Sequence, residues 1–161
     1  MPAMKLPAAA AGIVLAACIG LVALSPGPAV GAEDVAQVAE KRSMAMKAMG
    51  GAMRTIKGFV GGRGSKDDVV KAVAVIASTA PQIASLFPKG TGMEALPKSE
   101  AKAEIWTKWD AFTAAAKTLG DKAAVLAAAV DSGDKGKIGA AFGDLGQNGC
   151  GGCHRVFRQK R

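Results

Sequence analysis

The sequence is poor in the residues that most metal sites and nucleic-acid interfaces use. Its 161 residues include one histidine, three cysteines and no tyrosine, and aromatic residues make up 4% of the chain. A zinc site usually takes four thiolate or imidazole ligands, and few are present here. The net charge of +8 is strongly basic, but with few aromatic residues and no recognisable binding motif it does not indicate nucleic acid. No run of residues is typical of β-strands.

The few cysteine and histidine residues gather near the C-terminus, in the sequence CGGCH at 150–154. Two cysteines three residues apart, followed at once by a histidine, form the pattern for covalent attachment of haem. On a helical turn this spacing puts both side chains on one face, so that Cys150 and Cys153 reach two vinyl groups along one edge of the porphyrin. His154 then offers the proximal imidazole ligand of the iron. The sequence therefore predicts one covalently bound haem c.

Other interpretations of the cysteine pair have less support. A structural disulfide is the simplest of them, and a zinc site lacks a second Cys or His pair. A redox-active pair of the thioredoxin type belongs at a helix N-terminus within a βαβ unit. Because His154 is the only histidine, two axial histidines cannot come from this chain. The other face of the iron therefore carries a methionine, a weaker group or nothing.

Residues 1–32 have the features of a cleaved export signal. Lys5 provides a positive start, residues 8–24 are almost all apolar, and a proline- and glycine-rich break leads to a cleavage site after Ala32. An uncleaved anchor is one alternative, but a run of about 17 residues is at the low edge for spanning a bilayer. A lipoprotein anchored at Cys18 is another, although the residues after this cysteine stay apolar.

Cleavage leaves residues 33–161, the size of one domain. We predict that this domain is periplasmic and has no integral membrane span, which fits the cofactor because c-type haem is attached outside the cytoplasm. Lys5 is the only charged residue of the signal, so the mature chain keeps a net charge of +7. We expect this charge to steer the protein towards acidic redox partners.

Hydrophobic residues recur every three or four positions in four stretches, as in amphipathic helices. Ser65 and Asp68 form a capping box before the second helix, Pro81 is expected to bend that helix, and Pro88 to end it. Because the connections are short, we predict an all-α, antiparallel four-helix bundle with its covalently attached haem c between facing helices. The predicted helices cover residues 34–59, 66–87, 102–130 and 135 to the C-terminus.

The bundle geometry predicts which methionine lies opposite the haem. His154 lies roughly 10 Å from the end of helix four, beside the N-terminal half of the antiparallel helix one. Met46 lies about 18 Å and Met49 about 22 Å into helix one, whereas Met53, at about 28 Å, is too deep. The three methionines also form a stripe on one helix face, and such stripes are more often core than ligands.

Two sets of residues resemble the class II cytochromes c, the cytochrome c′ superfamily. One is AFGDLG at 141–146 leading into CGGCHRVFR at 150–158, and the other is Lys41-Arg42 followed by the methionine stripe. The pairs Ile105-Trp106 and Phe87-Pro88 add to the resemblance. It covers essentially the whole mature region and implies a four-helix bundle with one haem.

The resemblance implies that the residue four positions after Arg42, which is Met46, faces the distal side of the haem. Most cytochromes c′ have a non-ligating apolar residue there and a five-coordinate, high-spin iron, while a smaller subgroup has methionine and a low-spin iron. We therefore expect Met46 to ligate the iron and the chain to belong to the low-spin subgroup. Met49 is the second candidate, and core packing of Met46 is the alternative.

Two arginines are further candidates for haem contacts. Arg158, one turn beyond His154, resembles the family's basic residue near the proximal histidine, and its alternative role is that of a solvated terminal cation. Arg42 is expected to contact the haem pocket or to pair with a propionate.

These features together predict an electron carrier. With His154 and Met46 on the iron, both oxidation states prefer the same six ligands, and the thioether favours Fe(II). We find no acid–base constellation, so we do not expect an enzyme. The alternative is a high-spin, five-coordinate cytochrome c′ that binds or buffers nitric oxide or carbon monoxide with Met46 off the iron. Dimerisation through the first two helices is common in the family, so a homodimer also stays open.

Overall fold

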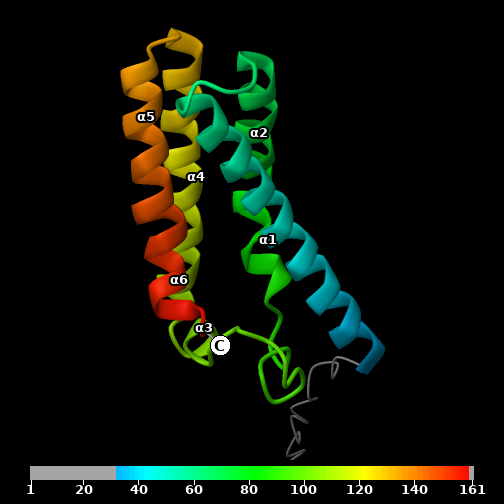
Figure 1. The fold of residues 1–161 in the computed structure, drawn as a ribbon. Helices are drawn as coiled ribbons and strands as arrows, with labels where there is room; N and C mark the ends of the chain where they lie inside the picture. Colours follow the sequence, from blue (N-terminus) through cyan, green and yellow to red (C-terminus); the bar gives the residue numbers. More distant parts are fainter. Residues whose placement is uncertain (1–31, 160–161) are drawn as a thin grey trace, which may run out of the picture.

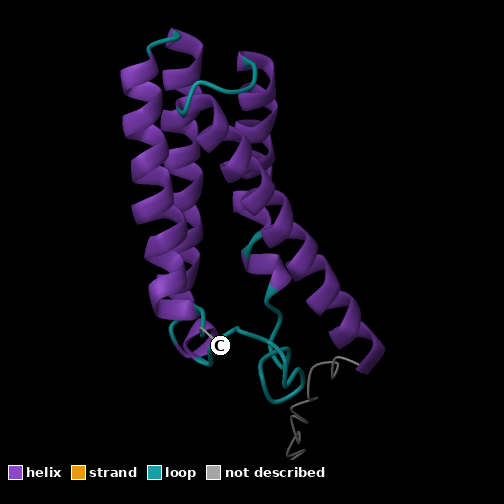
Figure 2. Cartoon of the chain, in the orientation of Figure 1, coloured by secondary structure: helices purple, strands orange, loops and turns teal. Residues whose placement is uncertain are grey.

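The computed structural model describes residues 32–159, and within them it is helical without a strand (Figure 2). The signal peptide predicted for residues 1–32, including Cys18, lies outside the described residues apart from Ala32, so it stays a prediction. None of the described helices combines the length and the hydrophobicity that a bilayer span requires. The α-helices are α1 (Ala32–Val60), α2 (Lys66–Thr79), α3 (Glu104–Thr107), α4 (Trp109–Ser132), α5 (Lys135–Asp144) and α6 (Gly151–Phe157).

The long helices α1, α2, α4 and α5 lie side by side along the molecule (Figure 1). α1 and α4 run towards one end, whereas α2 and α5 run towards the other, and α6 continues the direction of α5. This arrangement confirms the predicted all-α, antiparallel four-helix bundle. The N-terminal half of α1 slants away from α6, so the two diverge towards the end of the molecule that carries α3.

Local sequence signals set several helix ends where we expected them. The Ser65 hydroxyl accepts a hydrogen bond from the Asp68 backbone N–H at 3.1 Å, and the Asp68 carboxylate accepts one from the Ser65 backbone N–H at 3.3 Å. This confirms the capping box of α2. At the turn between α4 and α5, Gly133 has a φ of 71°, a left-handed conformation that glycine adopts without steric cost. Asp134 then caps α5 by accepting from the N–H of Gly136.

The second helix ends earlier than predicted. Proline lacks a backbone N–H and its ring crowds the preceding turn, so Pro81 does not merely bend the helix. The α-helix stops at Thr79, and the chain continues in two 3-10 turns, Ala80–Gln82 and Ala84–Leu86. A loop with Thr91 buried in it follows. The prediction of one bent helix up to residue 87 was therefore wrong.

The third predicted helix is also interrupted, at Lys108, whose backbone has φ −125° and ψ 48°. The short α3 before the break is held by Trp106, whose indole Nε1–H lies 3.0 Å from the carbonyl oxygens of both Phe87 and Pro88. Trp109, the first residue of α4, is 39% exposed. These contacts are long-range, and the helical periodicity around residues 102–130 gives no sign of them.

A cluster of aromatic rings packs at the end of the bundle that carries α6. Phe112 of α4 is 2% exposed, and its ring centroid lies 5.0 Å from that of Phe87 and 5.3 Å from that of Phe157. Both pairs meet edge to face, a favourable arrangement for aromatic quadrupoles. Phe112 therefore joins α4 to the loop after α2 and to the end of α6.

Replacing Phe112 with alanine should lower the free energy of unfolding by about 3–5 kcal/mol, because it removes a large buried side chain that three elements share. The matched control is Val125→Ala on the same helix, where the side chain is 59% exposed and the expected change is within about 0.5 kcal/mol. Urea denaturation followed by circular dichroism measures both. Equal effects for the two variants would show that the cluster does not hold the helices together.

Candidate haem site

The CGGCH sequence lies where a π-helical segment, Leu145–Cys150, passes into α6. In this segment the Gly151 N–H bonds to the carbonyl of Gly146, five residues earlier, instead of four. We expected one uniform helix from residue 135 to the C-terminus, so the widened turn corrects that prediction. Single π turns within α-helices occur frequently at functional sites.

The widened turn is supported from two sides. The guanidinium Nη1 of Arg155 donates a hydrogen bond to the carbonyl of Gln147 at 3.2 Å. On the inner side, a Cβ at Gly149 would lie 3.2 Å from methyl groups of Leu119 and Leu145. Glycine at 149 therefore lets the segment pack closely on α4 just before the first cysteine.

Both cysteines of the motif are half-buried free thiols that pack against the hydrophobic core. Burial raises the pKa of Cys150, and burial together with the neighbouring Cys150 raises the pKa of Cys153 to about 11. At neutral pH both are therefore neutral thiols. A redox-active CxxC pair instead depends on a lowered thiol pKa, so the structure gives that interpretation no support.

His154 follows the second thiol and is exposed at the surface of α6. Partial burial is the main cause that lowers the pKa of His154, and the positive charge of Arg158 lowers it further. The Glu100 carboxylate acts in the opposite direction. The imidazole is therefore neutral at neutral pH, which is the form that ligates a metal.

A contact between α1 and the π-helical segment sets which methionine is level with this motif. The terminal methyl of Met53 lies 3.4 Å from the Cβ position of Gly146. Because the helices run antiparallel, stepping back seven residues to Met46 covers about 10 Å, and stepping forward eight residues from Gly146 to His154 covers about 12 Å. Met46 is half-buried and Met49 is 7% exposed. The ligation of iron by either methionine stays a prediction.

Arg42 has a set of contacts that the sequence did not indicate. It is 8% exposed, its Nε–H donates to the Leu86 carbonyl at 3.0 Å, and its Nη atoms donate to the carbonyl and the hydroxyl of Thr91. Its guanidinium also lies 4.0 Å from the ring centroid of Phe87. Burial lowers the pKa of Arg42 to about 10, so it stays charged at neutral pH. Arg42 ties α1 to the loop after α2, and its predicted haem contact stays a prediction.

Arg158 lies directly after α6 and forms an ion pair with Glu100, with 2.6 Å between Nε and Oε2. Sequence analysis assigned no role to Glu100, because its partner is far away along the chain. Whether Arg158 also contacts the haem stays a prediction.

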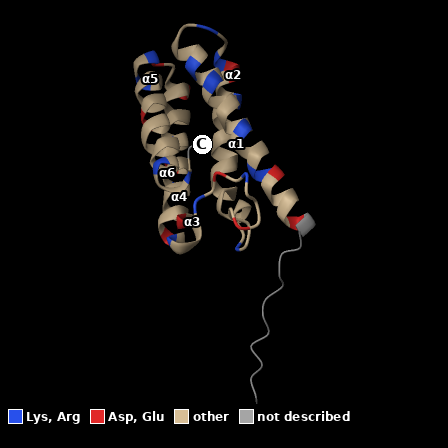
Figure 3. Cartoon of the chain, turned by 60° about the horizontal axis from the view of Figure 1, so that its bottom comes forward, with Lys and Arg blue, Asp and Glu red and all other residues tan. Residues whose placement is uncertain are grey.

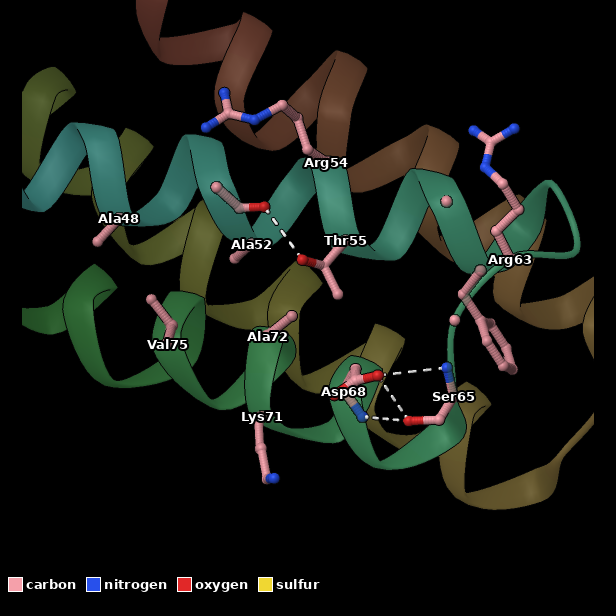
Figure 4. A pocket seen from close by; sticks show the side chains of 14 residues that line it. Ala48, Ala52, Arg54, Thr55, Arg63, Ser65, Asp68, Lys71, Ala72 and Val75 are labelled. Carbon is pink, nitrogen blue, oxygen red and sulfur yellow. Dashed lines mark hydrogen bonds between the residues drawn. The ribbon is translucent and has the colours of Figure 1, made fainter.

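Two hollows of the described surface lie away from the motif. One, of about 590 Å³, lies between α1 and α2 and is edged by Arg54 and Lys71 (Figure 4). The other, of about 540 Å³, lies between α4 and α5 beside Val125 and Lys137. Residues 150–154 line neither hollow, so neither is a candidate for the haem site.

The donor set at 150–154 fits haem c. Two thiols three residues apart are followed directly by a neutral imidazole, all within about one turn of helix, and α1 diverges from α6 at this end of the bundle. A four-helix bundle with such an attachment sequence near its C-terminus defines a class II cytochrome c.

Comparison with known proteins identifies the family within that class. The family model described as Cytochrome C′ matches residues 37–158, and the chain belongs to the cytochrome c′ family. It is 36% identical over 121 residues to the cytochrome c′ of Pararhodospirillum photometricum, which covers 74% of this chain and 94% of that protein. Proteins of this family carry one covalently attached haem c, and that is the cofactor of this chain.

Solved structures agree with this assignment. The crystal structure of cytochrome c′ from Thermochromatium tepidum superposes with a TM-score of 0.70 at 29% identity, covering 78% of this chain and 97% of that one. A variant of cytochrome c prime from Alcaligenes xylosoxidans, solved with nitric oxide, has a TM-score of 0.68 at 26% identity. The match covers 83% of this chain and 100% of that one. Another variant, with carbon monoxide bound, has a TM-score of 0.67 at 28% identity and covers 81% and 98%.

These comparisons support the class II cytochrome c superfamily. They do not support the predicted placement in its low-spin subgroup, because the matching proteins carry the name cytochrome c′ itself.

Replacing the cysteines tests their assignment to the haem. With both thiols intact, the haem should stay attached to the chain under denaturing conditions, and intact-mass measurement should show one haem per chain. Cys150→Ala and Cys153→Ala should each leave one thioether and shift the spectrum of the pyridine complex, and the double variant should lose covalent haem. Retention of covalent haem in the double variant would contradict the assignment.

Arg42→Lys should lower the free energy of unfolding by about 2 kcal/mol, because a lysine cannot reach the three acceptors that the guanidinium holds and hydrogen bonds from charged groups are worth about 1.5–3 kcal/mol. Arg54→Lys, at an exposed position of the same helix, is the matched control and should have little effect. Urea denaturation provides the comparison, and a stability of Arg42→Lys equal to that of the control would disprove the anchoring role.

Proposed function

We propose that this chain is a periplasmic haem c protein that binds or buffers small diatomic gases, nitric oxide or carbon monoxide, and is not an enzyme. The observation that carries the proposal is the match of residues 37–158 to the cytochrome c′ family. It is supported by similar structures solved as complexes with nitric oxide and with carbon monoxide. When bound, the haem supplies an iron whose free face takes such a ligand.

Each residue of the motif has a role in this proposal. Cys150 and Cys153 fix the haem covalently, and His154 offers a neutral imidazole as proximal ligand. On the opposite side Met46, level with His154 along the bundle, shields the distal face without ligating it. A flexible, apolar side chain there excludes water and anions and lets a small uncharged molecule enter.

The surface charge fits a soluble, exported carrier of this kind. Lysine and arginine residues are spread over α1, the loop after it and α6 (Figure 3). We propose that the net positive charge steers the protein towards acidic redox partners that reduce the iron. A homodimer through α1 and α2 stays a proposal from the family resemblance.

A second candidate function is electron transfer, and one specific observation favours it. Met46 is half-buried against the core, on the helix that faces the motif, and lies at the level of His154. A thioether placed there would complete six-coordination by the only histidine and a methionine. The protein would then exchange electrons and would not accept a gas readily.

Visible spectra of the haem-loaded protein separate the two functions. We expect a high-spin spectrum in wild type and in Met46→Leu, since leucine has a similar volume but no sulfur. Reduced wild type should bind carbon monoxide readily, with a clear shift of its main absorption band. Met49→Leu is the matched control for the second methionine and should behave in the same way.

The opposite result has a distinct signature. A low-spin spectrum with the far-red methionine–iron(III) band, abolished by Met46→Leu but not by Met49→Leu, together with slow carbon monoxide binding, would replace the gas-binding proposal with the electron carrier.

A further inference from the structure

The end of α6 is held by a short segment far away in the sequence. Ala101 and Arg158 form an isolated antiparallel bridge, in which the Lys102 N–H donates to the Phe157 carbonyl at 3.0 Å and the Gln159 N–H donates to the Glu100 carbonyl at 2.8 Å. Phe157 and Ala101 are both buried. The main chain around Glu100 is therefore fixed to the main chain at the end of the haem-bearing helix.

On this bridge the Glu100 carboxylate meets the Arg158 guanidinium, with 2.6 Å between Oε2 and Nε. Arg158 follows His154 by four residues at the end of a helix, a spacing that puts side chains on the same face. The Arg158 N–H also donates to the His154 carbonyl at 3.2 Å, so the ion pair lies one helical turn from His154. The pair therefore flanks the proposed proximal ligand.

We propose that Glu100 is a positioning residue for Arg158, holding the guanidinium at a fixed place beside His154 so that its positive charge acts on the haem iron. Without Glu100, the Arg158 side chain would turn into solvent and its charge would be hydrated and screened. The proposal rests on the proposed ligation of the iron by His154, but it is independent of whether the protein binds gases or carries electrons.

The bridge makes Glu100 suitable for this role. Its backbone carbonyl accepts from Gln159, so the position of its Cα does not depend on the ion pair. Glu100→Gln keeps these main-chain contacts and removes only the charge. Half of the Arg158 side chain and 38% of the Glu100 side chain are exposed, so we expect the effect to be modest and to weaken with salt.

The experiment is a double-variant cycle on the midpoint reduction potential of the haem-loaded protein, measured by optical redox titration. Arg158→Gln removes a positive charge near the iron, favours Fe(III) and should lower the potential. In the Glu100→Gln background Arg158 is already released, so the same replacement should give less than half of that shift. Raising the ionic strength should shrink the shift in the wild-type background.

Two controls make the cycle specific. Asp67→Asn also removes one exposed carboxylate, but at the start of α2, at the other end of the bundle (Figure 1). In the Asp67→Asn background, Arg158→Gln should lower the midpoint potential by the same amount as in the wild-type background. Glu100→Asp keeps the charge on a shorter side chain and should restore part of the shift. Thermal unfolding followed by circular dichroism checks that every variant is folded.

Equal shifts for Arg158→Gln in the wild-type and Glu100→Gln backgrounds would overturn the positioning role, since two independent charges simply add. No shift in the wild-type background would overturn it as well. The visible spectrum of His154→Ala, compared with that of the wild type in both oxidation states, tests His154 ligation separately and for either coordination number. An unchanged spectrum would disprove the proposed ligand set, whereas a changed spectrum with equal shifts would disprove only the role of Glu100.

Discussion

The packing of Phe112 between Phe87 and Phe157 is the contact on which the haem-bearing end of the bundle depends. These rings come from α4, from the loop after α2 and from the end of α6. α6 is only seven residues long and continues the π-helical segment without a break, and tertiary contacts hold it at both ends. The buried ring of Phe157 and the main-chain bridge to residues 100–102 fix its end, and the close packing at Gly149 fixes its start.

The position of α1 is set in a different way, by a buried charge. Arg42 donates to Leu86 and Thr91 and lies over the ring of Phe87, which connects α1 to the same aromatic cluster. Two turns beyond Met46, Met53 contacts the π-helical segment at Gly146. Met46 thus lies between two anchors of α1. The two anchors therefore fix the register of α1 along the bundle although its N-terminal half diverges from α6.

The sequence predicted the parts of this structure that depend on local chemistry. The capping box of Ser65 and Asp68, the glycine turn at 133 and the CGGCH sequence each carry their signal within a few residues. The break at Lys108, the π-helical segment and the exposure of Trp109 were not predicted, because they follow from contacts between distant residues. Trp106 bonds to carbonyls of the loop after α2, and Gly149 fits against Leu119. Neither contact alters the spacing of apolar residues from which helices are predicted. The anchoring of Arg42 was also not predicted. Its acceptors in Leu86 and Thr91 are far away along the chain, and most of them are backbone carbonyls, which every residue has.

The overall fold and the residue at position 46 give different information about function. A match of the overall fold places the chain in its family, but the function depends on particular side chains at the site. Met46 is a single side chain with three rotatable bonds and a soft sulfur, and its anchored helix sets its height along the bundle but not the direction of its thioether. In the two proposed functions, the Met46 thioether would either ligate the iron or only shield it, and the two would differ by rotation of one side chain. A bond between one thioether and the iron would leave the fold unchanged, so similarity to the family does not reveal whether it forms. The family match therefore favours gas binding, whereas the methionine at position 46 favours electron transfer.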